Sequence, residues 1–531
     1  MEKLFDAKSE SILDITEFAA EALRKNDINP NLIYEYQLLV EEITIKLVDN
    51  AKQGAQIKVD VFKHLGGTNI KLTCPGKAII LEQEDEFDFG GKIIEEFGDY
   101  IKQSYSAGVN QITFSSSTTE SNHFLVQSGI YIGLSLAVAL IMNFLLPESA
   151  VQWANENIVF PLVSIFAKCL GTVATPVAFF SLAAFLVTLK LTIESDKKLL
   201  VLVIRYIATS IAALVFGVII WDIYKKVGIS FDLNMVRTQT DNFMGNTVGE
   251  FIEESVAGNL IEPFTGTSPV PMLVMGIILG IAAGSYFGPY GDVARNGLEA
   301  LNGLFCKMMD VVYNVIPFFL FFALIRGWMD YGFTYYLSLL KNIVILLPGF
   351  ILLAILYLVE LGISGISPLR FIKDYRMILL ENLKIGSNIQ AMPYNKRTMS
   401  RMISLPRDIL EKGLKLGSMM NMDGNCVIIS MGIMGMIAST GIELSVAKWI
   451  MLAFIVILLS VGAPNQPGSF LLGMAVLMSF VGLSSNLTGD LLIIEALLGK
   501  LYSCANATGD IVTLAIENQR YEKKMRKENA K

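Results

Sequence analysis

Long apolar runs between residues 124 and 364 constrain the fold more than any other feature of this sequence. The first runs from Phe124 to Leu146, and the others lie at about 158–189, 199–224, 268–290, 311–325 and 343–364. Each is long enough, or nearly so, to cross about 30 Å of hydrocarbon as a helix. Because 53% of the 531 residues are hydrophobic and only 17% are charged, the composition indicates an integral membrane protein.

After residue 376 the apolar segments become shorter and are broken by Gly, Pro, Asn and Ser. Two such breaks are "KIGSNIQAMPYN" (384–395) and "VGAPNQPGSFLLG" (461–473). Irregular backbone at membrane depth is tolerated only where it is buried in protein or lines a polar cavity, and paired interrupted segments are typical of a transporter's binding site. We expect two re-entrant hairpins with tips at 386–393 and 462–468; ordinary loops between full helices are the alternative.

The distribution of Lys and Arg predicts the orientation in the membrane. Segments 190–200 and 367–376 are basic, whereas 147–157 has no Lys or Arg, so the first two read as inside and the third as outside. The acidic loop 225–267 fits least well. The first 30 residues contain no signal peptide pattern. We therefore expect a multi-pass protein of the cell membrane with both termini in the cytoplasm.

The stretch "LGSMMNMDGNC" (416–426) places a carboxylate in apolar surroundings. Asn421 and Asp423 are two residues apart and do not share a face of a regular helix. If both serve one site, the helix is unwound there, and Gly424 permits this. Freed carbonyl oxygens, a carboxylate and an amide would form a hard-oxygen cation site. The alternative is an aspartate that faces an aqueous groove for structural reasons.

A second polar cluster is "YSCANATGD" (502–510). Ser503, Asn506 and Asp510 lie on one helical face, and Tyr502 lies one turn before Asn506. A third is "RYIATS" (205–210), whose hydroxyl residues, taken alone, read as ordinary helix packing. The cysteines and the two histidines have no disulfide or metal-site spacing.

Several stretches together resemble one known family. They are "NMDG" (421–424), "NATGD" (506–510), "YIATS" (206–210), "FAKCLGTVATPVAFFSL" (166–182) and "VYNVIPFFLFFALI" (312–325). With them, the segment from about 123 to 520 resembles the dicarboxylate/amino acid:cation symporters of the glutamate-transporter fold. The resemblance implies a membrane all-α fold of eight transmembrane helices and two re-entrant helical hairpins, usually a homotrimer. It also implies sodium-coupled symport of a small organic solute, a dicarboxylate or amino acid, by an elevator mechanism. We expect no enzymatic activity, no organic cofactor and no nucleic-acid partner.

The resemblance also implies site residues. One sodium site would be formed by Gly417, Asn421, Asn506 and Asp510. Another would be formed by Tyr206, Thr209, Ser210, Asn421 and Asp423. The solute would contact the hairpin tips and the eighth helix through Ser387, Asn388, Gln390, Asn465, Gln466, Tyr502, Ser503 and Asn506.

The departures from the family pattern concern the solute. Tyr502 stands where members that transport acidic amino acids have an arginine, the natural bidentate partner of a carboxylate. Gly499 stands where they have the aspartate that binds the amino group. Lys500 is a possible substitute cation, one residue off the face. We expect that acidic amino acids are not recognised in the usual way.

Residues 1–122 resemble the histidine-kinase-like ATPase fold of anti-sigma factors. "LLVEEITIKLVDNA" (38–51) corresponds to its nucleotide-binding helix, 57–76 reads as two strands, and 90–116 as a closing helix and strand. Lys46 replaces the magnesium-binding asparagine and Cys74 the adenine-binding aspartate, so this domain is predicted to be catalytically degenerate and regulatory. An unrelated small α/β domain is the alternative.

The sequence thus predicts three parts: a cytosolic domain at 1–122, a membrane domain at 123–520 and a basic cytosolic tail at 521–531. Symport is one predicted function. The alternative is a membrane sensor that reports ligand occupancy through the N-terminal domain to a cytosolic protein partner.

Overall fold

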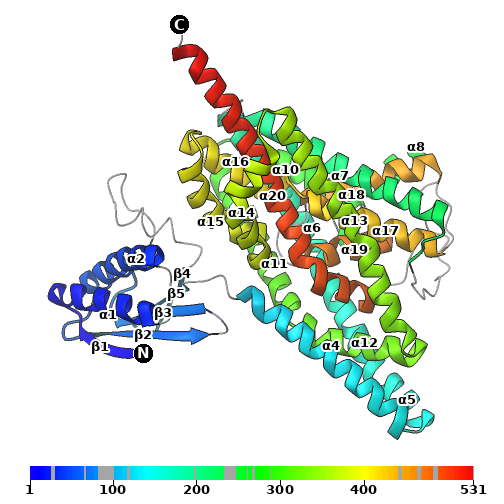
Figure 1. Cartoon of the computed structure of the whole chain (residues 1–531), viewed down its shortest axis with the longest axis horizontal. Coiled ribbons are helices and arrows are strands. Elements are labelled where there is room, and N and C mark those ends of the chain that lie inside the picture. The colour runs from blue at the N-terminus through cyan, green and yellow to red at the C-terminus, as the bar shows by residue number, and fades with distance from the viewer. Residues whose placement is uncertain are drawn as a thin grey trace. The chain divides into compact units, whose positions relative to one another are not determined.

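The computed structural model describes residues 1–25, 30–64, 67–79, 81, 101–115, 120–195, 199–231, 247–259, 261–265, 270–288, 290–440, 445–462, 468–481 and 488–529. The chain divides into two compact units, Met1–His123 and Phe124–Lys531 (Figure 1). Each is described by itself below.

The N-terminal unit is a five-stranded antiparallel sheet with two helices packed against it (Figure 1). The strands are β1 (Glu2–Asp6), β2 (Gln56–His64), β3 (Gly67–Pro75), β4 (Ile101–Ser106) and β5 (Val109–Ser115), in the order β1-β2-β3-β5-β4. The helices are α1 (Ile12–Lys25) and α2 (Pro30–Asp49), with the short turn η1 (Ser9–Ser11) before them. Side chains alternate across a strand, so Ile57, Val59 and Val61 of β2 all point into the core shared with the helices.

The prediction for the N-terminal unit was right for β2 and β3 and wrong for part of 90–116. "IKQSYS" is the strand β4, not helix, and pairs with β5 through a two-residue turn. Ala107 and Gly108 both have positive φ there, 52° and 78°, as a tight hairpin turn requires. Residues 90–100 lie outside the described residues. The edge strand β1 was not predicted from the sequence.

The second unit is helical, as predicted. Within the described residues, six spans are long and apolar enough to cross a membrane. They are formed by α4 (Glu120–Leu145), α6 (Phe160–Ser195) with α5 (Glu148–Ala154) and η3 (Asn155–Val159) before it, α7 (Leu200–Val227), α13 (Thr334–Ile363), α16 (Arg407–Met420) with α17 (Asp423–Thr440), and α20 (Thr488–Asn529). A pair bent by 49°, α11 (Gly291–Asn314) and α12 (Ile316–Tyr331), adds a seventh span if the two helices cross as one. The apolar helix α10 (Val270–Ser285) is shorter.

Two helical hairpins complete the membrane unit. The first is α14 (Pro368–Ile385) and α15 (Asn388–Met402), and the second is α18 (Val446–Gly462) and α19 (Ser469–Phe480). Gly386 ends α14 with a left-handed φ of 68°, the usual way a glycine stops a helix. The tip of the second hairpin, 463–467, lies outside the described residues. Two short helices, α8 (Val248–Glu254) and α9 (Glu262–Thr265), lie between α7 and α10.

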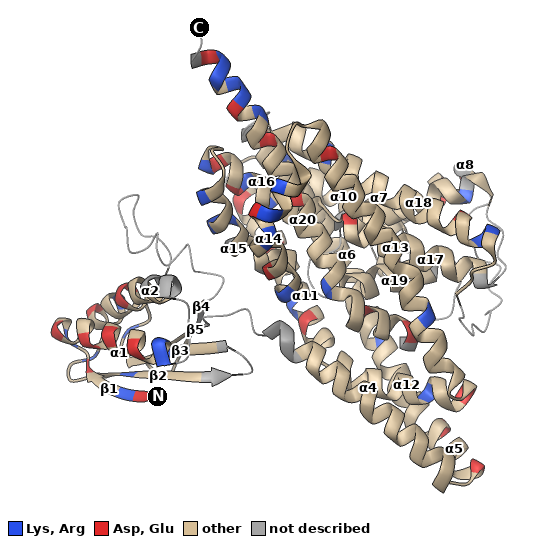
Figure 2. Cartoon of the chain, in the orientation of Figure 1, with Lys and Arg blue, Asp and Glu red and all other residues tan. Residues whose placement is uncertain are grey.

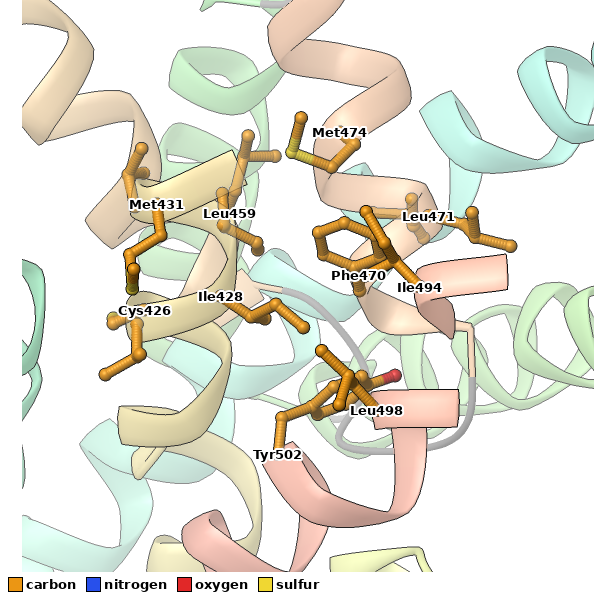
Figure 3. Packing of buried hydrophobic residues seen from close by; sticks show 14 of the residues in the cluster. Cys426, Ile428, Met431, Leu459, Phe470, Leu471, Met474, Ile494, Leu498 and Tyr502 are labelled. Carbon is orange, nitrogen blue, oxygen red and sulfur yellow. The ribbon is translucent and has the colours of Figure 1, made fainter. Parts of the chain in front are cut away.

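The broken helix α16–α17 forms the centre of the membrane unit. In its most apolar stretch, 100% of the residues are buried inside the protein, whereas in that of α4 only 17% are. Figure 3 shows apolar side chains of α17, α18, α19 and α20 packed together around it, among them Ile428, Leu459, Phe470 and Leu498. A helix surrounded on all sides by protein can carry polar groups at membrane depth that a lipid-facing helix cannot.

Charged residues are sparse in the middle of the membrane unit and frequent at its helix ends (Figure 2). The 42 residues of α20 correspond to about 63 Å of helix, about twice the thickness of the hydrocarbon layer. The last part of α20, from Arg520 onward, carries most of its charges and extends away from the bundle (Figure 1).

Candidate functional site

The break between α16 and α17 positions the first carboxylate of the site. Asn421 has φ −87° and ψ 87°, so the helix stops at Met420 and resumes at Asp423. The unwinding was predicted, but Gly424 does not cause it, because Gly424 is already helical. Its missing side chain serves packing instead: a Cβ at Gly424 would lie 2.2 Å from the Tyr502 carbonyl oxygen.

Asp423 is fully buried and accepts hydrogen bonds from two other helices. Ser210 Oγ of α7 donates to Oδ1 at 2.8 Å, and the Tyr357 hydroxyl of α13 donates to Oδ2 at 2.7 Å. The Tyr357 hydroxyl is also 3.2 Å from the carbonyl of Ala505. Asp423 is therefore the point at which α7, α13, α17 and α20 meet.

The other two predicted ligands on α7 lie close by with different partners. The Tyr206 hydroxyl donates to the Gly413 carbonyl at 3.2 Å, and Thr209 Oγ1 donates to the carbonyl of Tyr206 in its own helix at 3.1 Å. Both side chains are buried. The structure thus brings Ser210 into direct contact with Asp423, whereas Tyr206 joins α7 to α16.

Asp510 of α20 is the second buried carboxylate. Asn421 Nδ2 donates to its Oδ1 and Asn388 Nδ2, at the first hairpin tip, to its Oδ2, each at 2.8 Å. Gly417 faces the same group, and a Cβ there would lie 2.4 Å from Asp510 Oδ1. Asp510 therefore ties α20 to α15 and to the end of α16.

Asn506 of α20 connects the surroundings of Asp423 with those of Asp510, because its side chain caps the start of α17. Its Oδ1 accepts from the backbone N–H of Gly424 at 2.8 Å, and its Nδ2 donates to Asn425 Oδ1 at 3.2 Å. The first N–H groups of a helix have no partner within the helix, so this side chain satisfies the start of α17. The carbonyl of Asn506, in turn, accepts from Asn421 Nδ2 at 3.0 Å.

The donor set fits a small cation with hard oxygen ligands. Four hydrogen bonds to the two carboxylates come from Ser210, Tyr357, Asn388 and Asn421, which are all neutral. Asn421 Oδ1 is buried and has no hydrogen-bond partner among the described residues. Buried negative charge needs a compensating partner, and carboxylate, amide and carbonyl oxygens are suitable ligands for such an ion. The described residues contain no group of three or more His, Cys, Asp or Glu able to hold a metal.

Apart from Asn506 and Tyr502, the residues predicted to contact the solute fall into three groups. Ser387 and Asn388 are buried at the first hairpin tip, and Asn388 points to Asp510. Ser503 is buried, and its Oγ has no partner among the described residues. Asn465, Gln466 and the side chain of Gln390 lie outside the described residues.

Tyr502 is fully buried and belongs to a polar chain that the sequence did not reveal. Its hydroxyl donates to Glu495 Oε1 at 2.9 Å and lies 3.4 Å from Ser469 Oγ. Asn425 Nδ2 donates to Ser469 Oγ at 2.9 Å. These residues extend the site from α17 and α20 to the start of the second hairpin's return helix.

Sequence reasoning missed Tyr357, Asn425, Ser469 and Glu495. For Glu495 a signal existed, namely a single acid in the apolar run "LLIIEALLG" (491–499), which a search for intramembrane charges finds. Tyr357 gives no such signal, because its side chain is uncharged and its partner Asp423 is 66 residues away.

Lys500, the possible substitute cation, lies beside the first hairpin. Its Nζ donates to the carbonyl of Lys384 at 2.8 Å, in the last turn of α14, where a cation complements the helix dipole. Its alkyl chain fills the space next to Gly386, since a Cβ there would lie 2.6 Å from Lys500 Cγ.

In the N-terminal unit, Cys74 is buried in the core between sheet and helices, and burial raises the pKa of its thiol. It packs as an apolar side chain there. Lys46 lies in the last turn of α2, and its carbonyl accepts from Asn50 Nδ2 at 3.0 Å.

Relatives with stated functions are similar to this chain. A C4-dicarboxylate transport protein of Deinococcus radiodurans is 24% identical over 338 residues, which cover 61% of this chain and 74% of the relative. One from Deinococcus deserti is 24% identical over 367 residues, 66% of this chain and 80% of the relative. A third, from Rhizobium etli, is 22% identical over 370 residues, 67% of this chain and 80% of the relative.

The family itself follows from a match that covers most of the chain. The sequence profile of the sodium:dicarboxylate symporter family matches residues 124–519, which include the broken helix, both hairpins and every side chain of the buried site described above. The protein is thus a multi-pass membrane transport protein, not an enzyme, and it belongs to the sodium:dicarboxylate symporter family.

Proposed function

We propose that this protein is a sodium-coupled symporter of a small organic solute, a dicarboxylate or an amino acid, and that it works by an elevator mechanism. The observation that carries the proposal is the meeting of two buried aspartates, Asp423 and Asp510, with neutral donors from four other segments. The family and the names of the relatives support a dicarboxylate-type solute.

Sodium would bind in this proposal through the two carboxylates and the polar groups around them. The ion would offset buried negative charge that neutral hydrogen bonds leave uncompensated. One site would use Gly417, Asn421, Asn506 and Asp510. The other would use Asp423 with Asn421, Tyr206, Thr209 and Ser210, and Tyr357 would hold the Asp423 carboxylate in place.

The solute would bind between the two hairpin tips, near Ser387, Tyr502 and Ser503. Coupling would follow from the shared residues: Asn506 contacts the start of α17 and also, through Asn425 and Ser469, the second hairpin. Because hydrogen bonds tie α7, α13, α15, α16, α17 and α20 into one body, we propose that these helices cross the membrane together.

Sodium binding by the purified protein tests this proposal. Asp423→Asn keeps the size of the side chain and removes its charge, so sodium affinity should fall at least tenfold, about 1.4 kcal/mol. The measurement is sodium-dependent thermal stabilisation in detergent, with potassium or choline chloride at equal ionic strength. Unchanged sodium dependence in this variant would refute the assignment. Uptake into proteoliposomes of a solute panel, with and without a sodium gradient, tests transport itself.

We further propose a homotrimer in the cell membrane with both termini in the cytoplasm, and a regulatory role for the N-terminal unit. The basic segments 190–200 and 367–376 support this orientation. The degenerate positions Lys46 and Cys74 support a role in binding a cytosolic protein rather than in ATP hydrolysis. Chemical cross-linking in membranes tests the trimer, and protease accessibility in sealed vesicles tests the orientation.

A further inference from the structure

An ion pair joins two of the membrane helices that hold Asp423. Arg205 Nη2 on α7 lies 2.6 Å from Glu360 Oε2 on α13, and the two side chains are only 16% and 24% exposed. Within the part of the chain that the structure describes, neither side chain forms a second ion pair. Ionisable groups inside membrane spans are costly and usually functional. The hydrogen bonds described above for the two carboxylate clusters do not involve this pair.

The two helices are fastened to each other at two levels. At one level Arg205 binds Glu360, and at the other the Tyr224 hydroxyl donates to the Ile345 carbonyl at 3.0 Å. Because the later residue of α7 pairs with the earlier residue of α13, the helices are antiparallel. Both helices contact Asp423 between these two levels.

The ion pair is the fastening nearer to the site. Tyr357 precedes Glu360 by three residues, about 4.5 Å of helix, and Ser210 follows Arg205 by five, about 7.5 Å. Tyr224 lies fourteen residues beyond Ser210, about 21 Å of helix. The ion pair therefore sets the register of α7 against α13 at the level where their two hydroxyls meet the carboxylate.

The hydroxyls depend on this register because they bind different oxygens of one carboxylate. Ser210 donates to Asp423 Oδ1 at 2.8 Å, and Tyr357 donates to Oδ2 at 2.7 Å. A slide of one helix along the other by about 1.5 Å, the rise of one residue, moves the two donors apart by a similar distance. A rigid carboxylate cannot follow both donors, since hydroxyl hydrogen bonds span only about 2.5–3.0 Å. The orientation of Asp423 thus depends on how α7 lies on α13.

We propose that Arg205 and Glu360 are positioning residues for the sodium site at Asp423. Their ion pair fixes α7 against α13, so that Ser210 and Tyr357 hold the carboxylate in the orientation that receives the ion. Neither charged side chain touches sodium, and each acts through the hydroxyl on its own helix. This inference rests on the proposed sodium-coupled symport and adds two residues to its binding machinery.

Neutral substitutions of the two partners separate positioning from a direct effect of charge. Glu360→Gln leaves a positive charge near the site and Arg205→Gln leaves a negative one. A charge effect alone therefore weakens sodium binding in the first variant and strengthens it in the second. Loss of positioning weakens binding in both. We expect sodium affinity to fall about tenfold in each variant, within the usual coupling of residues in one network.

The measurement is thermal unfolding of the full-length protein in detergent, titrated with sodium chloride against choline chloride at constant ionic strength. The sodium concentration that gives half of the maximal stabilisation reports affinity, and the melting temperature without sodium reports structure. Glu360→Asp keeps the charge and shortens the side chain by one methylene group. It should also weaken sodium binding, so it supplies the same test where a neutral variant does not fold.

Two combined variants show whether the pair acts through the hydroxyls. Arg205→Glu with Glu360→Arg rebuilds the ion pair in reverse and should restore sodium affinity to within about threefold of the unmodified protein. In a Tyr357→Phe background, Glu360→Gln should change sodium affinity by less than about twofold. With the donor on α13 already removed, the register of that helix no longer affects the carboxylate.

Asp222→Asn is the matched control for loss of an ion pair on α7. Asp222 Oδ2 lies 2.6 Å from Lys226 Nζ in the same helix, and the side chains are exposed. This substitution breaks an ion pair without loosening α7 from α13. Sodium affinity should stay within about twofold of that of the unmodified protein, since exposed pairs contribute little.

The outcomes distinguish this inference from the proposed function. Stronger sodium binding in Arg205→Gln would show a charge effect and overturn the positioning role. A lower melting temperature with unchanged sodium affinity in Arg205→Gln, Glu360→Gln and Glu360→Asp would show a purely structural pair and overturn it as well. Absence of sodium binding in the unmodified protein would instead overturn the proposed symport, and the inference with it.

Discussion

Single residues at close contacts decide whether the buried site can form, and Gly509 is one of them. A Cβ there would lie 2.4 Å from Asn421 Nδ2, 2.7 Å from the Tyr357 hydroxyl and 3.1 Å from Asp423 Oδ2. Both carboxylate clusters therefore converge on this one position. Any side chain at 509 has to displace groups that the proposed sodium sites share.

Gly509→Ala should weaken sodium binding at least tenfold. Alanine is normally better than glycine inside a helix by about 0.8–1.0 kcal/mol, so loss of affinity cannot come from helix propensity. Gly303→Ala on α11 is the control, because a Cβ there meets nothing within 4 Å. Sodium titration of thermal stability measures both variants. Equal affinities for sodium would show that the contacts around Gly509 are irrelevant to the ion.

Asn506→Ala should destabilise the protein even without sodium. The substitution removes the side-chain acceptor at the start of α17, and loss of such a cap costs about 0.5–2 kcal/mol. Thermal unfolding in potassium buffer measures the effect. Thr508→Ala is the control, because its hydroxyl bonds only within α20 to Cys504 at 2.7 Å. A melting temperature for Asn506→Ala as high as that of Thr508→Ala would contradict the capping role.

At the scale of helices, close packing of small residues replaces hydrophobic burial as a source of specificity. Gly276, Gly280 and Gly284 are spaced four apart on α10 and face α6. A Cβ at Gly280 would lie 2.7 Å from the Ala183 carbonyl oxygen and 2.9 Å from Leu186 Cβ. The backbones of the two helices are thus close enough that only glycine fits.

Gly280→Val should separate α10 from α6 and lower stability by about 1–3 kcal/mol, the usual cost of overpacking. Gly297→Val is the matched control, since Gly297 is exposed on α11 and has open space around its Cα. Thermal unfolding in detergent distinguishes the two variants. Similar melting temperatures for both would show that the α6–α10 contact tolerates side chains.

Sequence patterns were sufficient for the hairpins and for the break in the seventh helix. Gly, Pro and Asn inside apolar runs are informative, because a lipid environment permits irregular backbone only where protein surrounds it. The same reasoning misassigned the break to Gly424, because the sequence does not show that Tyr502 packs against this residue. Partners such as Tyr357 and Glu495 depend on which helices pack together, and a helical pattern alone does not contain that information.

At the scale of the whole molecule, the two units have separate cores. The N-terminal unit buries the apolar side of its sheet under α1 and α2, and the proposed sodium ligands all lie beyond residue 200. Among the described residues, each of these two cores is formed by side chains of its own unit. All the residues of the proposed sodium sites accordingly lie in the second unit.

Removal of residues 1–115 should therefore leave a folded membrane protein that still binds sodium. The truncated and the full-length proteins are compared by sodium-dependent stabilisation and by uptake under one gradient, where we expect a changed rate but retained coupling. The isolated N-terminal unit, assayed beside them, should not hydrolyse ATP. Magnesium-dependent turnover by that unit, or complete loss of sodium binding on its removal, would contradict this division of roles.

The cap that Asn506 places on α17 also imposes an order on biosynthesis. Gly424 and Asn506 are 82 residues apart, so at about 5–20 residues per second the ribosome needs about 4–16 seconds to supply the cap after it has made the helix start. Throughout that interval the nascent α17 carries an acid and unpaired N–H groups that lipid cannot satisfy. We therefore expect the membrane insertion machinery to shelter α17 until α20 has been synthesised.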